Sequence, residues 1–475
     1  MVTTAEKSPQ GHWPENFAAL SIHRREDWTV TVKGFNRFVW DFEGSTSKLE
    51  NVHGIFQSHG AMLIANSEEA LKAHDVNEGW DWTKVPGATT MSLTLQETRL
   101  EKERNFSPLS FAGGVAFRGT ESLSSGAFGM DFHQPEYDFF DRNHPYPNIK
   151  LYFKKSVFFY QNLLVCLGSN VRLENGSAKK AQTTLFQDKL LRGSSSFFIE
   201  VDGAQKDCSA PLQSTTPYAT SGEKGYTSLV DTKGNSYYIP RSSASSLKLH
   251  IKNQTSETPS AEPSEGCYGT AWLEHSSSNR SYEYAIYIRT PSYPRTADEA
   301  WSYHENDTTS KLYEVLKKDD EAHVVKFGMA PERWTIISPV YGYVIFRSTT
   351  TLPQGPIMAV DRHCRIMVED SENYLYLSIS HPDLNFPVSK VLQTLKDIGA
   401  REMYDLESQE IQVQVTLTIN VEMILPTTPV VHGSPIDYTP SIRVEPSSSS
   451  PSNKGNKIVF DNLKNAFSLE IKLKK

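Results

Sequence analysis

Short runs in which apolar and polar residues alternate recur along most of this chain, with Gly, Asn and Ser between them. An alternation with a period of two is typical of a strand that has one face in a core and the other in water. The pattern is longest at Ile411–Met423, and Trp28–Val32 and Asn373–Ser380 share it. Two denser apolar runs, Lys155–Tyr160 and Leu163–Gly168, predict a pair of adjacent strands.

Helical patterns are few and short. Asp298–Glu305, Ser310–Lys318 and Ser389–Ile398 have an apolar spacing that favours helices, and the last of them ends before Gly399 as a helix should. Phe35–Phe42 is expected to form a strand. The pattern as a whole predicts an all-β protein with large sheets, and it leaves the function open.

The length and the course of the pattern suggest how the chain is divided. A chain of 475 residues can bury a sizeable core. Residues 1–13 are mostly polar and are expected to be a flexible tail. Residues 14–350 are expected to form one large β domain, and residues 351–475 a smaller C-terminal β-sandwich.

The charge balance and the lack of long apolar segments narrow the range of partners. The formal net charge is -8, whereas surfaces that bind nucleic acid are basic, so no nucleic-acid partner is expected. No stretch approaches the ~20 apolar residues of a membrane span, and the first ten residues lack the apolar region of an export signal. Neither a membrane partner nor a signal peptide is therefore expected in this chain.

The cysteines and histidines show no ligand spacing for a metal. The four cysteines lie far apart and form no C-x-x-C pair, so neither a zinc site nor a redox motif is predicted. Cys166 lies in an apolar run and is expected to be a buried free thiol. The spacing of the cysteines neither requires nor excludes disulfides. His53, His59 and His133 are scattered and are interpreted as structural.

The most distinctive stretch is Gly79–Thr90, which reads Gly-Trp-Asp-Trp-Thr-Lys-Val-Pro-Gly-Ala-Thr-Thr. Two indoles followed by Pro-Gly do not fit a helix interior, because Pro lacks an N–H and Gly costs entropy. In an extended segment Trp80 and Trp82 share one face. They either pack as an aromatic plug or form a platform for a flat ligand, and packing is the favoured interpretation.

The same loop closely resembles the W-x-W-x-x-x-P-G-x-T segment of the chondroitin and hyaluronate lyases, polysaccharide lyase family 8. Other stretches resemble this family in the same order from about Asp27 to Leu377, and the ABC-type chondroitin lyases are the most similar group. These stretches are Phe111–Gly114, Gly126–Met130, Lys154–Phe159, Leu164–Asn170, Thr183–Gln187, Ser281–Tyr284, Leu312–Lys318 and Asp320–Val325.

The resemblance implies a fold and a chemistry. Family members have an N-terminal α/α toroid, a central antiparallel β super-sandwich like that of galactose mutarotases, and a smaller C-terminal β-sandwich. This chain resembles the last two parts. The family cleaves a 4-linked uronic acid by β-elimination, in which hydrogen-bond donors neutralise the carboxylate and a base removes the C5 proton. An Asn, a His, a Tyr and an Arg of the toroid do this, and no segment here resembles the toroid helices.

One catalytic residue of the family comes from the β domain. It is the Glu of an N-x-E-N-like turn, which helps to order the Tyr and the His of the toroid. The matching turn is Lys48–Asn51, so the resemblance implies this auxiliary role for Glu50, with Glu43 as the alternative. Lys48 stands where the family has Asn, and Asn51 is a substrate-binding candidate beside the acid.

Four further residues are substrate-binding candidates. Arg24 and Arg37 carry guanidinium groups that suit bidentate contacts with sulfates or uronates. The favoured alternative for Arg24 is a surface turn in which its basic cluster pairs with the acidic residues that follow. Trp80 and Trp82 are candidates for stacking on sugar rings.

Two hypotheses follow. In the first, the chain is a component of a glycosaminoglycan lyase acting on chondroitin or dermatan sulfate or on hyaluronan, with the toroid supplied by a partner chain or by a missing N-terminal domain. In the second, it is a non-catalytic carbohydrate-binding protein derived from a lyase. No cofactor is predicted, although calcium stays open, and the resemblance implies an extracellular or periplasmic location.

Overall fold

The computed structural model describes most of the chain. The residues described are 7–44, 50–66, 72–98, 109–134, 149–175, 179–191, 198–209, 211–213, 225–244, 246–256, 262–290, 297–306, 311–349, 351–353, 355–385, 408–424, 430–432, 441–446, 455–464 and 466–475.

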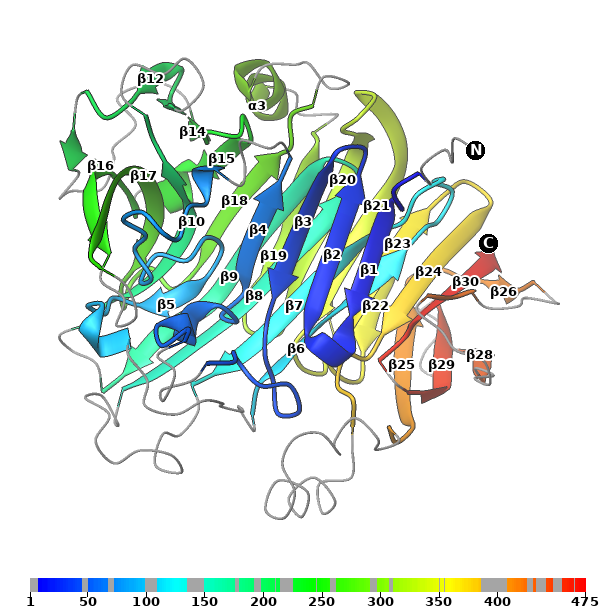
Figure 1. Cartoon of the computed structure of the whole chain (residues 1–475). Coiled ribbons are helices and arrows are strands. Elements are labelled where there is room, and N and C mark those ends of the chain that lie inside the picture. The colour runs from blue at the N-terminus through cyan, green and yellow to red at the C-terminus, as the bar shows by residue number, and fades with distance from the viewer. Residues whose placement is uncertain are drawn as a thin grey trace, which may run out of the picture.

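The front layer of the molecule in Figure 1 contains two antiparallel sheets. The four-stranded sheet has the order β1 (Gly11–Glu15), β2 (Leu20–Arg25), β3 (Trp28–Lys33) and β4 (Ala61–Ala65). The five-stranded sheet has the order β13 (Leu212–Gln213), β16 (Leu247–Ser256), β17 (Ser264–His275), β10 (Ala181–Lys189) and β5 (Thr89–Met91).

A nine-stranded sheet lies behind this front layer (Figure 1). Its order is β12 (Ala204–Lys206), β11 (Ile199–Val201), β14 (Tyr226–Val230), β15 (Ser236–Pro240), β18 (Tyr282–Tyr287), β9 (Leu163–Glu174), β8 (Lys150–Tyr160), β7 (Ser125–His133) and β6 (Phe111–Phe117).

Two more sheets complete the stack. The eight-stranded sheet contains β19 (Tyr313–Lys318), β20 (Ala322–Ala330), β21 (Thr335–Ile345), β23 (Cys364–Asp370), β24 (Tyr374–Ser380), β30 (Ser468–Lys474) and β26 (Glu422–Met423), with β27 (Val430–His432) also paired to β30. The last sheet has the order β22 (Ile357–Val360), β25 (Ile411–Leu417), β29 (Asn456–Leu463) and β28 (Ile442–Pro446).

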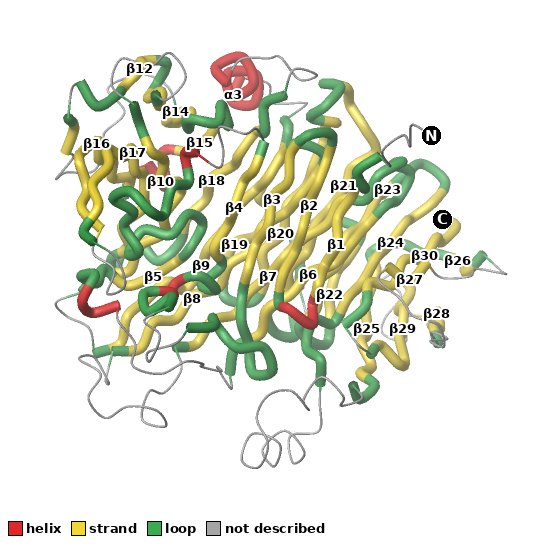
Figure 2. The backbone as a smooth tube through the Cα atoms, viewed as in Figure 1, coloured by secondary structure: helices red, strands yellow, loops and turns green. Residues whose placement is uncertain are grey.

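Helices are few among the described residues, as the tube in Figure 2 shows. The α-helices are α2 (Arg241–Ala244) and α3 (Ala297–Asn306). The short 3-10 helices are η1 (Asn16–Ala18), η2 (Gly54–Phe56) and η3 (Gln96–Thr98).

Three apolar cores join these layers. One lies between the front layer and the nine-stranded sheet, one between the nine- and the eight-stranded sheets, and one between the eight-stranded sheet and the last sheet. Phe159 and Cys166 of the nine-stranded sheet face the first core, whereas Phe158 and Val165 face the second. Both faces of this sheet are therefore buried, which explains why β8 and β9 read as nearly continuous apolar runs.

The predicted all-β super-sandwich is confirmed, together with the adjacent strands β8 and β9 and the helix at Asp298–Glu305, which lies within α3. The helix predicted at Ser310–Lys318 is wrong, because Tyr313–Lys318 forms β19. A bulge between Val315 and Lys317 shifts the pairing with β20, and it breaks the alternation that would have marked a strand.

Two strand predictions also need correction. Phe35–Phe42 is not a strand, because the side-chain oxygen of Asn36 accepts the backbone N–H groups of Phe38 and Val39, at 2.8 and 2.9 Å, and turns the chain. The run Ile411–Met423 does not form one strand, because it divides into β25 and β26, which belong to different sheets. The helix predicted at Ser389–Ile398 lies outside the described residues.

The division of the chain at residue 350 stays a prediction. The eight-stranded sheet contains strands from both sides of that position, since β21 ends at Ile345 and β23 begins at Cys364. At the other end of the chain, β1 begins at Gly11, within the segment expected to be a tail.

The cysteines divide into one pair and two thiols. Cys166 is buried and free, as predicted, and Cys364 is also buried and free. Cys208 and Cys267 form a disulfide that ties the segment before β13 to β17. Among the helices of the described residues, none combines the length and the apolar character needed to cross a membrane.

Candidate functional site

The segment that carries Glu50 leads from the end of β3 to β4. Glu50 is exposed, and its carboxylate has no hydrogen bond or ion pair with another described residue. Asn51 adopts a left-handed conformation with φ 49°. Its side-chain nitrogen donates to the Glu43 carbonyl oxygen at 2.7 Å and to Gln57 Oε1 at 2.9 Å, and Gln57 Nε2 donates to Asn51 Oδ1 at 3.1 Å. The Asn51 amide therefore holds the turn that presents Glu50 to solvent.

The chain before this turn carries a buried carboxylate, Asp41, whose charge acts on Lys33 at the end of β3. The Ser58 hydroxyl donates to the backbone oxygen of Asp41, and Asp41 Oδ1 accepts the Phe42 N–H at 2.8 Å. Burial lowers the pKa of Lys33 to about 8, and the negative charge of Asp41 opposes part of that shift. The Lys33 ammonium therefore releases its proton more readily than a solvated lysine. Lys33 and Gln57 were missed by sequence reasoning, because neither belongs to a spaced motif.

A second contact fixes the turn on its other side. His53 Nδ1 lies 3.0 Å from the hydroxyl of Thr98, which is the last residue of η3. Burial of both groups keeps this contact out of water, so η3 and the Glu50 turn are held together.

Arg37 lies on the segment after β3, but its charge is already paired. Its Nε donates to Asp383 Oδ1 at 3.2 Å and its Nη2 to Asp383 Oδ2. The guanidinium also lies 4.5 Å from the ring centre of Phe38 and 5.6 Å from that of Phe111. Arg37 thus fastens its loop to the segment after β24, and a polyanion would have to compete with Asp383 for it.

Arg24 is on the outward face of β2 and is half-buried. Its neighbours in the predicted basic cluster point inward: Arg25 pairs with Glu332 at 3.5 Å, and His23 Nε2 lies 2.8 Å from the Gln161 carbonyl oxygen. The ion pair of Arg25 therefore joins β2 to a residue far along the chain, in place of the local pairing considered from the sequence.

The Trp loop lies against the five-stranded sheet. Trp80 is only 2% exposed, with its ring centre 4.3 Å from that of His74 and 6.1 Å from that of Tyr268. Trp82 is half-buried. Gln187 of β10 binds the loop between Trp80 and Trp82, because its Oε1 accepts a hydrogen bond from the Asp81 N–H at 2.9 Å. Trp80 has no exposed face for a sugar in this structure.

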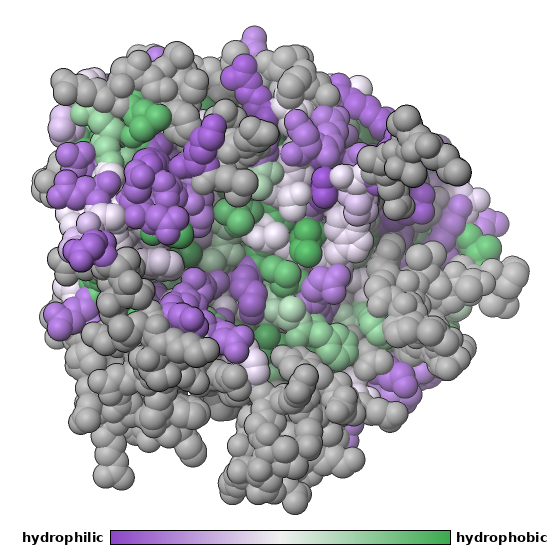
Figure 3. Space-filling model, viewed as in Figure 1, coloured by the Kyte–Doolittle hydropathy of each residue, from purple (hydrophilic) through white to green (hydrophobic). Residues whose placement is uncertain are grey.

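The structure thus brings together some of the predicted site residues. Glu50, Asn51 and the loop of Arg37 are joined through the hydrogen bond from Asn51 to Glu43, whereas Trp80 lies in the interior. Figure 3 shows apolar side chains at the centre of the front face with polar side chains around them. Within the described residues, no group of His, Cys, Asp and Glu is arranged to hold a metal ion.

Comparison with solved structures identifies the fold as that of polysaccharide lyases. The structure of Paenibacillus xanthan lyase matches 99% of this chain and 38% of that chain, with a TM-score of 0.68 and 16% sequence identity. The sequence model of the polysaccharide lyase family 8 super-sandwich domain matches residues 17–300. The chain therefore belongs to polysaccharide lyase family 8.

Two curated relatives are chondroitin lyases. The chondroitin sulfate ABC endolyase of Proteus vulgaris is 30% identical over 395 residues, which cover 82% of this chain and 35% of the relative. The chondroitin sulfate ABC exolyase of Bacteroides thetaiotaomicron is 25% identical over 440 residues, covering 87% of this chain and 38% of the relative. The chain thus spans well under half the length of these relatives.

Proposed function

We propose that this chain forms the β-domain side of a glycosaminoglycan lyase site that cleaves chondroitin sulfate, dermatan sulfate or hyaluronan at a 4-linked uronic acid. Membership of polysaccharide lyase family 8 supports the reaction class, and the relatives named above act on chondroitin sulfate. The observation that carries the proposal is the exposed Glu50 carboxylate on a turn fixed by the Asn51–Gln57 amide pair.

The reaction is an elimination without water. The C5–H bond breaks as a base takes the proton, the C4–C5 double bond forms, the C4–O4 bond breaks, and the leaving O4 receives a proton. Glu50 has no described partner of its own, so it is available to accept hydrogen bonds from the base and from the donors that neutralise the uronate. Those groups belong to an α/α toroid in the family, and in this proposal they come from a separate segment or chain.

The proposed location is extracellular or periplasmic, where glycosaminoglycans are accessible. The disulfide between Cys208 and Cys267 supports this location, because disulfides persist in oxidising compartments.

Glu50→Gln is expected to lower turnover about 100-fold, because loss of a group that orients catalytic partners typically costs about 10- to 100-fold. Turnover is measured from the ultraviolet absorbance of the unsaturated uronate, with the chain assayed alone and together with a separately expressed family toroid. Glu43→Gln is the matched control, since Glu43 is also exposed and lies on the same loop system.

Each outcome of this assay has a distinct meaning. Activity only with the toroid, lost in Glu50→Gln and kept in Glu43→Gln, supports the proposal. The reverse pattern in the two variants moves the role to Glu43. Turnover by the chain alone contradicts the proposal that the base and the uronate-neutralising donors come from a separate segment or chain. No turnover in either assay, with retention on a chondroitin sulfate column, favours a non-catalytic carbohydrate-binding protein.

A further inference from the structure

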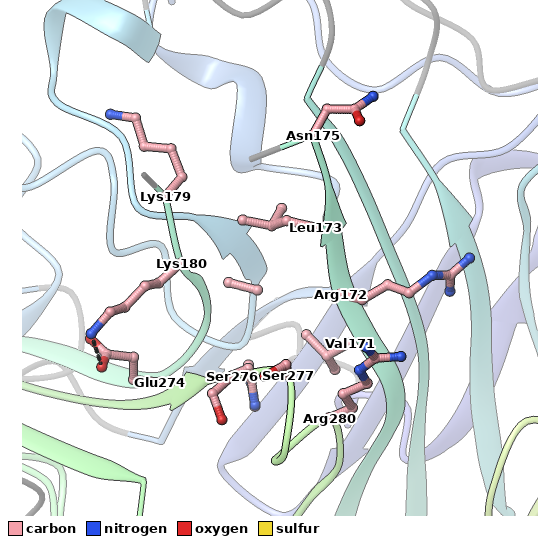
Figure 4. Close-up of a pocket in the computed structure, with 12 residues that line it drawn as sticks. Val171, Arg172, Leu173, Asn175, Lys179, Lys180, Glu274, Ser276, Ser277 and Arg280 are labelled. Atoms are coloured by element: carbon pink, nitrogen blue, oxygen red, sulfur yellow. Dashed lines mark hydrogen bonds and ion pairs between the residues drawn. The ribbon is translucent and has the colours of Figure 1, made fainter. Parts of the chain in front are cut away.

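A pocket of about 590 Å³ opens between the end of β9, the start of β10 and the turn that joins β17 to β18 (Figure 4). Its volume lies within the range of about 300–1,000 Å³ that is usual for small-ligand sites. Its lining includes the apolar Val171, Leu173 and Ala181 and the polar Ser276, Ser277 and Arg280.

The floor of the pocket is apolar. Val171 and Ala181 are buried, and both belong to the core between the front layer and the nine-stranded sheet. Leu173 packs against the same core, and Figure 4 shows its side chain pointing from β9 toward the segment that carries Lys179 and Lys180. A floor of this kind suits the C–H face of a sugar ring, which is the apolar side of a polar molecule.

The rim carries more positive than negative charge. Lys180 pairs with Glu274 at 2.6 Å, Lys179 with Glu97 at 2.8 Å, and Arg172 with Glu174 at 3.5 Å. The Arg172 guanidinium also lies 4.2 Å from the ring centre of Tyr152, and in Figure 4 it points away from the pocket. Arg280 is exposed and forms no ion pair with any described residue. Arg280 is therefore the rim cation without a described ion pair. Figure 4 shows its guanidinium beside Val171, so the side chain has to rotate toward the pocket to bind an anion there.

One buried polar atom in the wall lacks a partner. His275 is 3% exposed, and its Nε2 lies 2.8 Å from the Thr183 hydroxyl. Its Nδ1 has no hydrogen-bond partner in the part of the chain that the structure describes. Burial lowers the pKa of His275 to about 3, so the imidazole is neutral at physiological pH. The wall of the pocket at His275 is therefore uncharged.

We propose that this pocket is an accessory subsite for a uronate or sulfated sugar unit of an acidic polysaccharide, beyond the unit that reacts. The inference rests on the proposed function for its substrate class. Arg280 pairs with the carboxylate or sulfate, the Ser276 and Ser277 hydroxyls bind sugar hydroxyls, and Leu173 packs on the ring.

The pocket is physically connected to the Glu50 turn. Lys179 at the rim binds Glu97 of η3, and the next residue of η3, Thr98, contacts His53 three residues after Glu50. The rim of the pocket is therefore joined to the same short helix that supports the turn. This arrangement predicts that the pocket strengthens the binding of long oligosaccharides more than that of disaccharides.

The test is calorimetric binding of dodecasaccharides of chondroitin sulfate and of hyaluronan to the full chain. Arg280→Ala is expected to weaken binding of the sulfated ligand about tenfold, as loss of a charge-assisted contact does. Ser277→Trp, which places a bulky ring at the exposed rim, is expected to have a similar effect. Arg333→Ala is the matched control, since Arg333 is 68% exposed on the turn between β20 and β21.

The hyaluronan arm tells which anion Arg280 binds. An equal loss with hyaluronan assigns the contact to the uronate, and a loss confined to chondroitin sulfate assigns it to the sulfate. If both pocket variants bind as the unaltered chain does, the subsite is rejected. It is also rejected if Arg333→Ala weakens binding as much as the pocket variants do. Neither result affects the proposed function. If the unaltered chain binds neither ligand, the subsite is also rejected, and the proposed function is then decided by the turnover of Glu50→Gln alone.

Discussion

Gly79→Ala is expected to lower the free energy of unfolding by about 3 kcal/mol or more, because it combines a disfavoured backbone conformation with overpacking. Gly79 has φ +75°, which L-residues rarely adopt. A Cβ added there would lie 2.4 Å from the Gly266 nitrogen and 2.6 Å from the Gln254 carbonyl oxygen. Both are backbone atoms of paired strands, β17 and β16, so they cannot move aside without disturbing the sheet. Urea unfolding at constant pH measures the loss.

Gly234→Ala separates the two contributions. Gly234 has φ +80°, but a Cβ added there would have no heavy atom within 4 Å. This variant is expected to lose only the conformational cost, about 1–2 kcal/mol. Equal losses in the two variants would show that the strands do not press on Gly79, and would contradict the packing of the Trp loop described above.

The Trp loop illustrates how far the sequence reaches. Its two indoles and its Pro-Gly step excluded a helix and identified the family, since they are local features of a contiguous stretch. The sequence could not show why position 79 requires glycine, because the strand residues that crowd it lie about 175 and 187 positions later. The same holds for Trp80, whose partner Tyr268 comes from β17.

The candidate site was predictable only in part. The resemblance pointed to Glu50, which the structure places on an exposed turn, although its role stays a prediction. Arg37 was chosen for its chemistry, but its bidentate pairing with Asp383 depends on a contact 346 positions away. Arg280 was missed for a related reason: one arginine in a serine-rich turn forms no motif, and only the fold brings it beside Leu173 of β9. Sequence patterns report local periodicity, whereas a pocket depends on which strand ends meet.

Acidification from pH 7 to pH 5 is expected to lower the free energy of unfolding by about 2 kcal/mol for each of His59 and His275, and by about 4 kcal/mol for the two together. Burial lowers the pKa of each to about 3 in the folded chain. Histidine in the unfolded chain has a pKa near 6.5. Below that pH the unfolded state therefore binds protons that the folded state does not bind. This stability is fully present above about pH 6.5 and is lost as the pH falls toward the folded pKa. Asp131, whose pKa is lowered by His133 and Lys154 against the effect of burial, adds a further loss at more acidic pH.

His59→Phe tests this linkage at a single residue. The His59 ring lies among Phe35, Phe56 and Phe132, with centre distances of 5.7, 5.2 and 4.5 Å, so a phenyl ring fits the same environment. The variant loses a hydrogen bond to the Thr89 backbone, but it no longer takes up a proton on unfolding. Denaturant unfolding at pH 7, 6 and 5 should therefore give a slope against pH that is reduced by about one proton, or about 1.4 kcal/mol per pH unit. Phe153→Leu, in the same aromatic cluster, should lower stability at every pH and leave the slope unchanged. A His59→Phe slope equal to that of the unaltered chain would mean that His59 is already protonated, or exposed to solvent, in the folded state.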